Sequence, residues 1–407
     1  MSEQPAKTPD AAKVLRYPFD PVLFAAAVAL VVLGIVMSYS ASAVYAAQKY
    51  HDAAYFLERD LVYTVLGALG LWYGARTDFS AWRRWAYPML VLAMALLFAV
   101  LLVGARMNGA ARWFRLGPLS LQPAEPAKFA LVVWLSYSLA KKAEKVRIFA
   151  IGFLPHLVVA GLMAALLLRQ PDFGTAAILG LVTLLMLLVA GTKISYIVVA
   201  ILGAAPLCWK VVTGTPWRLR RMLAFLDPWP HRHDVGYQIT ESLISVGSGG
   251  ISGFGLGDGR QKLFFLPEAH TDFILAILGE ELGLIGITLV VVLFGILVWR
   301  GLRAAYRARE PFGAYLAFGI TALFGVQALT NMGVVLGSLP TKGLTLPLVS
   351  YGGSSLATTM FMAGVLLNVS RRAPVPKPDP LRRKRAPAAR NKMVPGSGRV
   401  VVIEAAE

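Results

Sequence analysis

The carboxylate best placed for catalysis is that of Asp272, which follows Glu268 and His270 in a polar segment just before a long apolar run. Partial loss of water at such an edge raises the pKa of a carboxylate and makes it a better general base near neutral pH. Aspartate at the start of a helix is also a favoured N-cap, which is a purely structural role. The residues alone leave both alternatives open, and Asp272 is the candidate catalytic residue.

A second ionisable group lies in the segment Gly109–Lys128, which contains Arg112 and ends with Glu125 and Lys128. Glu125 and Lys128 are three residues apart, so on a helix they share a face and can form an ion pair. One interpretation is an anchor at a helix start near the membrane surface. The other is a buried pair that lines a polar cavity.

A third group is the tight turn Arg169-Gln-Pro-Asp172 between two apolar runs. A proline and two charges cannot lie in lipid without cost, so we predict two helices that meet at this turn. Asp172 is expected to cap the second helix, and a role at a cavity wall remains open.

Three further segments have unusual polarity or backbone composition. The glycine-dense segment 247–259 carries neither a P-loop lysine nor a dinucleotide fingerprint, so nucleotide binding is unsupported. Glu280 and Glu281 follow inside an apolar run, where acidic residues must face protein or water and are functional by default. The segment 339–355 has two prolines and many small residues, which favours a re-entrant loop. Its Lys342 either contacts an anion or extends to the membrane surface.

The elements that must position these residues are apolar. Hydrophobic residues make up 57% of the 407-residue chain and charged residues 15%, against roughly 25% charged in soluble domains. We predict an all-α polytopic integral membrane protein with about ten transmembrane helices. The apolar runs lie at about 21–40, 60–75, 85–104, 126–140, 149–168, 173–191, 195–213, 273–299, 313–337 and 353–369.

The distribution of Lys and Arg predicts that both termini are cytoplasmic. We divide the chain into a cytoplasmic N-terminal segment (1–20), a ten-helix membrane domain (21–370) and a basic, disordered cytoplasmic tail (371–407). The large extracytoplasmic loop, 214–272, joins the seventh and eighth helices. The tail, with ten Lys and Arg against three acidic residues, holds much of the net positive charge of +18. Beside a membrane helix this favours anionic membrane lipid as a partner and not nucleic acid.

The polar clusters, in this order, resemble the SEDS family (shape, elongation, division and sporulation), and its division branch more than its elongation branch. The resemblance covers about residues 20–370. Ala124 departs from it, since serine is usual there. The matching motifs are Arg112-Trp113, Gln122-Pro-Ala-Glu-Pro-Ala-Lys128, Gln170-Pro-Asp-Phe-Gly-Thr175, Asp227-Pro-Trp229, Gly236-Tyr-Gln238, Gln261-Lys262, Pro267-Glu-Ala-His-Thr-Asp-Phe-Ile274, Gly279-Glu-Glu-Leu-Gly283, Leu339-Pro-Thr-Lys-Gly-Leu-Thr-Leu-Pro-Leu348 and Ser350-Tyr-Gly-Gly-Ser354.

The resemblance implies a peptidoglycan glycosyltransferase that polymerises lipid II at the division septum of the bacterial cytoplasmic (inner) membrane. It implies a class B penicillin-binding protein and other division proteins as partners, a divalent cation (Mg²⁺ or Mn²⁺) as cofactor, and Asp272 as the essential aspartate. The candidate substrate-binding residues are polar positions in or beside these motifs: Arg112, Glu125, Lys128, Gln170, Asp172, Gln238, Lys262, Glu268, His270, Lys342 and Ser350.

The main alternative is a transporter, and in particular a lipid II flippase that uses the same ligand. A transporter is expected to place ionisable groups near the middle of the membrane and to contain inverted repeats. Here the ionisable groups gather toward the predicted outer face, and the sequence has no visible repeat. These features favour the glycosyltransferase.

Overall fold

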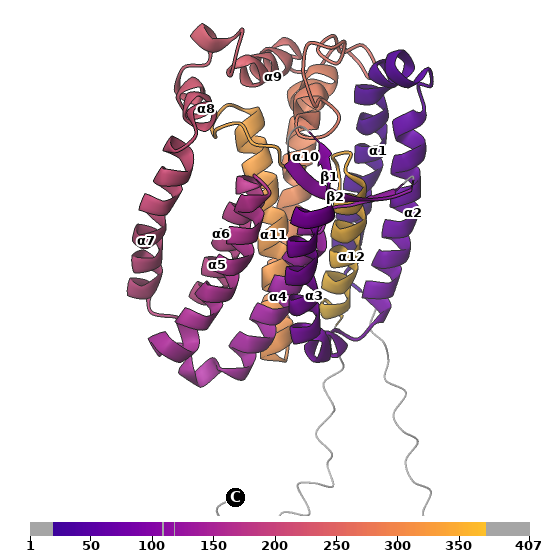
Figure 1. The fold of residues 1–407 in the computed structure, drawn as a ribbon. Coiled ribbons are helices and arrows are strands. Elements are labelled where there is room, and N and C mark those ends of the chain that lie inside the picture. The colour runs from indigo at the N-terminus through magenta and orange to yellow at the C-terminus, as the bar shows by residue number, and fades with distance from the viewer. Residues whose placement is uncertain (1–18, 108–109, 118, 372–407) are drawn as a thin grey trace, which may run out of the picture. The chain divides into compact units, whose positions relative to one another are not determined.

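The fold is mainly helical, as a computed structural model shows for residues 19–107, 110–117 and 119–371. Most of the predicted terminal segments 1–20 and 371–407 lies outside these described residues. Within the described residues, ten helices coincide with the ten predicted apolar runs (Figure 1). They are α1 (Pro21–Tyr50), α2 (Tyr55–Arg76), α3 (Trp82–Val103), α4 (Ala124–Lys141), α5 (Leu154–Arg169), α6 (Phe173–Val189), α7 (Ile194–Thr213), α10 (Ile274–Arg307), α11 (Pro311–Val335) and α12 (Gly353–Val369).

Length and apolar composition allow many of these helices to cross a membrane. Among the described residues, six helical segments qualify: Pro21–Tyr50, Phe79–Val103, Phe149–Arg169, Ile194–Thr213, Ile274–Arg307 and Pro311–Val335. The helices α6 and α12 are apolar but shorter. The helical, polytopic character of the fold is confirmed, whereas the number of crossings and their orientation stay predictions.

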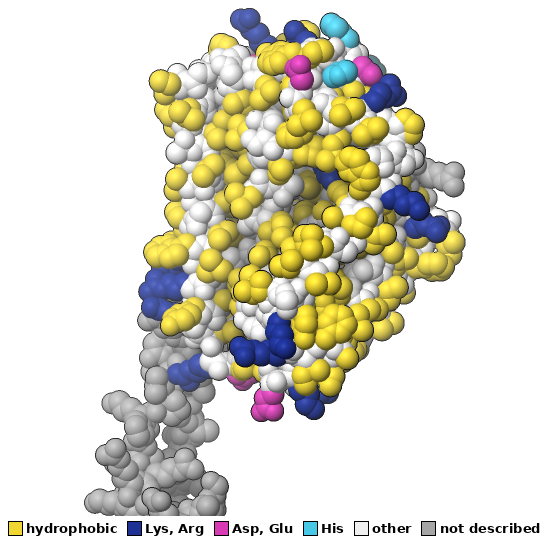
Figure 2. Space-filling view, turned by 90° about the vertical axis from the view of Figure 1, so that its left-hand side faces the viewer, with side chains coloured by type: hydrophobic (Ala, Val, Ile, Leu, Met, Phe, Trp, Pro, Cys, Tyr) yellow, Lys and Arg dark blue, Asp and Glu magenta, His cyan; other side chains and the backbone are white. Residues whose placement is uncertain are grey.

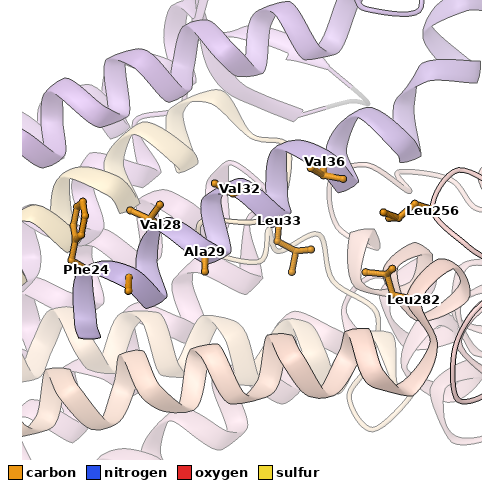
Figure 3. Close-up of a pocket in the computed structure, with 9 residues that line it drawn as sticks. Phe24, Val28, Ala29, Val32, Leu33, Val36, Leu256 and Leu282 are labelled. Atoms are coloured by element: carbon orange, nitrogen blue, oxygen red, sulfur yellow. The ribbon is translucent and has the colours of Figure 1, made fainter. Parts of the chain in front are cut away.

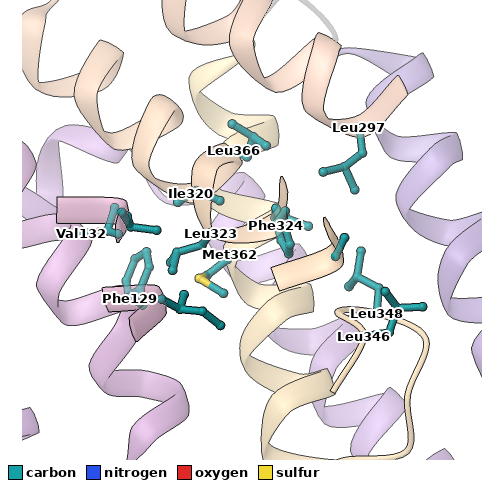
Figure 4. Packing of buried hydrophobic residues seen from close by; sticks show 14 of the residues in the cluster. Phe129, Val132, Leu297, Ile320, Leu323, Phe324, Leu346, Leu348, Met362 and Leu366 are labelled. Atoms are coloured by element: carbon teal, nitrogen blue, oxygen red, sulfur yellow. The ribbon is translucent and has the colours of Figure 1, made fainter. Parts of the chain in front are cut away.

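The short apolar run 126–140 forms α4, one of the most enclosed helices of the bundle. The α4 side chains Phe129 and Val132 are buried, and they pack with Ile320 and Leu323 of α11 and Met362 of α12 (Figure 4). Because its neighbours surround it, α4 has little contact with the exterior and does not need a long lipid-facing surface.

Close packing also joins α2 to α12. A Cβ at Gly74 would lie 2.9 Å from the carbonyl oxygen of Phe361, and one at Gly364 would lie 2.2 Å from that of Leu71. Small residues permit this close backbone approach between membrane helices.

A small antiparallel sheet, which the sequence analysis did not predict, follows α3. Its strands are β1 (Ala105–Met107), β2 (Ala110–Leu116) and β3 (Leu119–Leu121), in the order β1-β2-β3. Gly117, with φ +66°, supports the turn between β2 and β3. Such short strands carry little periodic signal, and the sheet places Arg112 on β2.

The long loop before α10 is partly helical. It contains α8 (Pro216–Leu226), the short helical segment Trp229–His231 and α9 (Tyr237–Ser248). Three other short helical segments, Phe79–Ala81, Ala143–Lys145 and Phe149–Phe153, lie elsewhere in the chain. The glycine-dense segment then runs into a break in α10 at Gly283, whose φ is +64°. The amide of Phe254 donates to the Glu280 carbonyl at 3.1 Å, and the amide of Leu284 donates to the Gly250 carbonyl at 2.9 Å. The loop therefore satisfies backbone groups that the broken helix cannot.

The start of α1 and the end of α12 meet at one end of the bundle. Asp20 caps α1, and its carboxylate pairs with Arg300 of α10, with a shortest N–O distance of 2.5 Å. The amide of Asp20 donates to the Ser370 hydroxyl at 3.2 Å. This arrangement supports an even number of crossings.

The surface has an apolar middle. Figure 2 shows one face on which hydrophobic side chains predominate in the middle, while Asp, Glu and His side chains lie near its upper and lower ends. An apolar groove of about 650 Å³ lies along α1 and is closed by Leu256 and by Leu282 of α10 (Figure 3). Its lining contains no ionisable side chain, so it offers no site for acid–base chemistry.

Candidate active site

Asp272 lies in a tight turn that ends at α10. The turn begins at Glu268, whose φ is +56° and whose carbonyl oxygen accepts bonds from the amides of Thr271, Asp272 and Phe273 at 3.2, 3.2 and 3.3 Å. Phe273 takes the N-cap position of α10 without a side-chain cap bond. The capping role for Asp272 is therefore not observed, and its carboxylate is left for other contacts.

The backbone of Asp272 is fixed from a second helix. The side-chain amide nitrogen of Asn331, in α11, donates to the Asp272 carbonyl at 2.8 Å and to the Leu344 carbonyl at 2.7 Å. Asn331 is buried. It therefore connects the Asp272 turn to the irregular segment before α12.

Four ionisable side chains act on the charge of the Asp272 carboxylate, and three of them come from distant parts of the chain. Burial raises its pKa to about 7, and Glu268 and Asp172 act in the same direction. The guanidinium groups of Arg112 and Arg221 oppose this shift by favouring the charged form. The result is a carboxylate that can take up or release a proton near neutral pH.

Arg112 reaches this position from β2 and is held by the α5–α6 turn. Its Nε donates to the Gln170 carbonyl at 2.8 Å, and its Nη2 donates to the Pro171 carbonyl at 2.6 Å. Asp172 caps α6 by accepting from the Thr175 amide at 3.1 Å, as predicted. The predicted pair of helices meeting at this turn is also confirmed.

The side chain of Gln170 has a structural contact in the bundle. Its Nε2 donates to the carbonyl oxygen of Leu97 in α3 at 2.9 Å, and the residue is buried. Gln170 thus fixes the turn that holds Arg112. Its backbone carbonyl, and not its side-chain amide, faces the site.

Arg221 was not predicted from the sequence. It lies on α8 and donates through Nη2 to the side-chain oxygen of Gln238 on α9. Burial lowers its pKa, and the charge of Asp272 opposes this effect. Gln238, a predicted substrate-binding residue, is therefore connected to the site by the hydrogen bond that it accepts from Arg221. The only available signal was the cluster of basic residues in the amphipathic stretch 216–226.

The segment before α12 forms another wall of the site. A Cβ at Gly343 would lie 2.8 Å from the Asp272 carboxylate, so the bare backbone approaches this group closely. The neighbouring Lys342 places its ammonium group 3.3 Å from the centre of the Phe173 ring. Lys342 thus lies on the Asp172–Phe173 side of the site.

His270 lies in an aromatic cluster on the opposite side of its turn. Its ring centre is 4.8 Å from that of Phe56, 5.6 Å from that of Tyr351 and 6.0 Å from that of Tyr45. Burial lowers the pKa of His270, which favours the neutral ring. The structure does not bring His270 to the Asp272 carboxylate.

Glu125 and Lys128 form the predicted ion pair inside the bundle. The ammonium nitrogen of Lys128 lies 2.9 and 3.0 Å from the two carboxylate oxygens of Glu125. Both residues are buried, with 5% and 1% of their surface exposed. The pair is confirmed, and burial excludes the membrane-surface anchor.

Lys262 belongs to a different cluster, which organises the glycine-dense loop. Its ammonium group donates to Glu281, Ser40 and the Gly257 carbonyl at 2.7, 3.1 and 2.6 Å. Glu280 accepts from the amides of Arg260 and Gln261 at 2.8 and 3.2 Å. Glu280 and Glu281 therefore hold the glycine-dense loop against the bundle, which is a structural role for acids at this depth.

Ser350 closes a turn within the segment before α12. Its hydroxyl accepts from the Leu346 amide at 2.8 Å, and both residues are buried. Buried irregular backbone of this kind fits the predicted re-entrant loop, because its polar groups are satisfied within the protein.

The described residues contain no group of three or more His, Cys, Asp or Glu side chains that could hold a metal ion. The divalent cation stays a prediction, and no chemical step below depends on it.

Comparison with other sequences identifies relatives over most of the chain. Residues 21–374 match the family FTSW_RODA_SPOVE, described as "Cell cycle protein". The chain is 49% identical over 356 residues to the "Probable peptidoglycan glycosyltransferase FtsW" of Geobacter sulfurreducens, covering 87% of this chain and 95% of that protein. It is 39% identical to "Stage V sporulation protein E" of Bacillus subtilis, covering 86% and 97%.

Solved structures agree. A chain of a complex described as "Structural coordination of polymerization and crosslinking by a peptidoglycan synthase complex" matches with a TM-score of 0.72 and 29% identity, covering 86% of this chain and 97% of that chain. The rod shape determining protein RodA of Thermus thermophilus matches with a TM-score of 0.64 and 28% identity, covering 86% and 96%. The chain therefore belongs to the FtsW/RodA/SpoVE family of cell cycle proteins, the SEDS family that its motifs resemble, and is most similar to the FtsW branch.

Proposed function

We propose that this protein is a peptidoglycan glycosyltransferase that polymerises lipid II at the division septum, in the bacterial cytoplasmic membrane. The observation that carries the proposal is the half-buried Asp272 carboxylate, which has a raised pKa and two guanidinium groups nearby. The same activity is supported by the name of a relative, "Probable peptidoglycan glycosyltransferase FtsW", 95% of whose length this chain matches.

In the proposed reaction, Asp272 acts as the general base. It removes the proton from the 4-hydroxyl group of the acceptor sugar while that oxygen attacks C1 of the donor sugar. The bond between C1 and the diphosphate oxygen breaks, and the diphosphate leaves with the electron pair. A single displacement on an α-linked diphosphate gives a β-linkage, so one base suffices and the donor carbon is inverted.

The leaving diphosphate needs positive charge near Asp272. Arg112 and Arg221 satisfy this need, since both act electrostatically on the Asp272 carboxylate. A guanidinium group can bind a phosphate group through two parallel hydrogen bonds. We assign Arg112 and Arg221 to leaving-group stabilisation in preference to Lys128, whose ammonium group is buried against Glu125.

The proposed partner is a class B penicillin-binding protein, within a larger set of division proteins. The likeness to a chain of a peptidoglycan synthase complex supports such a partner. A cytoplasmic location of both termini is part of the same proposal and rests on the distribution of basic residues.

The test is polymerisation of labelled lipid II by the purified protein with its penicillin-binding partner. Asp272→Asn is expected to reduce glycan synthesis by on the order of a hundredfold or more, the usual contribution of a general base. Asp52→Asn is a matched control, because Asp52 is exposed and caps the Ala54 amide, which asparagine also does. Normal polymer formation by folded Asp272→Asn would refute the base assignment. Movement of lipid II across vesicles without polymer formation would favour the flippase.

A further inference from the structure

Four buried side-chain oxygens without a hydrogen-bond partner within 3.5 Å belong to the packed helices α1 and α2. Ser38 and Ser42 are one turn apart on α1, and Asp60 and Thr64 are one turn apart on α2, so each pair shares a helix face. Asp60 is 2% exposed, and the two serines are fully buried. The two helices pack side by side (Figure 1).

Within the described residues, these oxygens have no hydrogen-bond partner within 3.5 Å: Ser38 Oγ, Ser42 Oγ, Asp60 Oδ1 and Thr64 Oγ1. The Ser38 hydroxyl lies beside the Asp60 carboxylate, near enough for a hydrogen-bonding interaction with it. A hydroxyl and a carboxylate that lie together, with the carboxylate Oδ1 still without a partner, can serve as two ligands of a third species. Such groups are costly to bury unless something satisfies them.

No basic side chain of the described residues pairs with Asp60. The adjacent Arg59 is directed to Tyr55: its Nη1 donates to the Tyr55 carbonyl at 3.3 Å, and its guanidinium lies 3.5 Å from the centre of the Tyr55 ring. The phenol of Tyr351 is affected by the charge of Asp60, and it carries no compensating positive charge.

We propose that Ser38, Ser42, Asp60 and Thr64 form a binding site for one alkali-metal cation, Na⁺ or K⁺. The ligands are hard oxygens, which suit hard cations. One carboxylate and neutral hydroxyls carry a single negative charge, so a monovalent cation gives a neutral buried site. A divalent cation would leave an uncompensated positive charge among apolar helices.

The site adjoins the aromatic cluster that supports the Asp272 turn. Phe56, one turn before Asp60 on α2, lies 4.8 Å from His270 and 5.2 Å from Tyr351 between ring centres. A cation that joins α1 to α2 would therefore also stiffen this cluster. The proposal of the site itself does not depend on the proposed function.

The test is thermal unfolding of the purified full-length protein in NaCl, KCl or choline chloride at equal ionic strength. The wild-type protein is expected to unfold at a higher temperature in NaCl or KCl, with a dependence that saturates, because a ligand of the folded state stabilises it by mass action. Asp60→Asn is expected to abolish the difference among the salts, and Asp52→Asn to retain it. Equal unfolding temperatures of the wild-type protein in all three salts would overturn the proposal.

A second variant guards against misfolding of Asp60→Asn. Ser38→Ala keeps the carboxylate and removes one ligand, so it is expected to raise the salt concentration at half-saturation. Binding of radioactive sodium, competed by KCl, gives an independent measurement. Unchanged half-saturation in Ser38→Ala together with a retained salt response in Asp60→Asn would show that the ion acts elsewhere.

Discussion

Asn331 joins two segments by donating from one side-chain nitrogen to the carbonyl oxygens of Asp272 and Leu344, at 2.8 and 2.7 Å. Asn331→Ala removes both bonds while leaving the Asp272 carboxylate present. We expect the turnover number to fall about tenfold or more, with little change in KM for lipid II, because misplacement of a base affects the chemical step.

The matched control for this prediction is Thr330→Ala, one residue away. Thr330 bonds only back to the Val326 carbonyl of its own helix, at 2.7 Å, so its removal should leave turnover unchanged. Equal losses in both variants would indicate a general effect on α11. A loss in KM alone in Asn331→Ala would contradict a positioning role.

The pH dependence of polymerisation should report the charges around Asp272. Because the base must be ionised, the rate is expected to rise with pH through a pKa of about 7. Glu268 raises this pKa, so Glu268→Gln should move the rising limb to lower pH. Arg221 lowers it, so Arg221→Gln should move the limb to higher pH.

Rates measured from pH 5 to 9 would check these two shifts. Arg115→Gln serves as a control, since Arg115 is exposed on the strand that carries Arg112. Shifts of the same sign in Glu268→Gln and Arg221→Gln would rule out Asp272 as the group that titrates.

The parts of the site that depend on residues close together in the sequence could be predicted. The turn at 169–172, the cap by Asp172 and the pairing of Glu125 with Lys128 all depend on residues a few positions apart. Spacing alone therefore defines them. The ten apolar runs likewise correspond to ten helices. Helix α1 continues past its predicted end to Tyr50, through alanine-rich turns that close with Gln48 and Lys49 and carry a weaker apolar signal.

Contacts between distant segments could not be predicted. Arg221 reaches Asp272 only because the loop before α10 folds into α8 and α9, and Asn331 acts through backbone carbonyls that any residue supplies. The partners of Glu280 and Glu281 could not be predicted either, although both acids face protein, as their depth in the apolar run requires. They bind loop amides and Lys262, which the sequence does not bring near them.

The buried pair of α4 allows a test that separates stability from substrate binding. Glu125→Gln leaves the Lys128 ammonium buried without its counter-charge, which should destabilise the protein by about 3–5 kcal/mol. The double variant Glu125→Gln, Lys128→Met removes both charges and should recover most of that loss in thermal unfolding. If the double variant is stable but does not polymerise lipid II, the pair has a role beyond folding. Full activity would instead exclude the predicted substrate contact.

The break in α10 should depend on a glycine at position 283. Its φ of +64° with ψ of −158° is a conformation that residues with a Cβ rarely adopt. A Cβ there would also lie 2.5 Å from the Gly253 nitrogen and the Ile251 carbonyl oxygen. Gly283→Ala should therefore expel the glycine-dense loop from the break, lower the unfolding temperature by several degrees and reduce polymerisation.

The matched control is Gly295→Ala, in the same helix with open space around it. This variant should keep its activity, and its folded state should gain up to about 1 kcal/mol of stability from helix propensity. Equal stability of the two variants would show that the loop does not depend on the break.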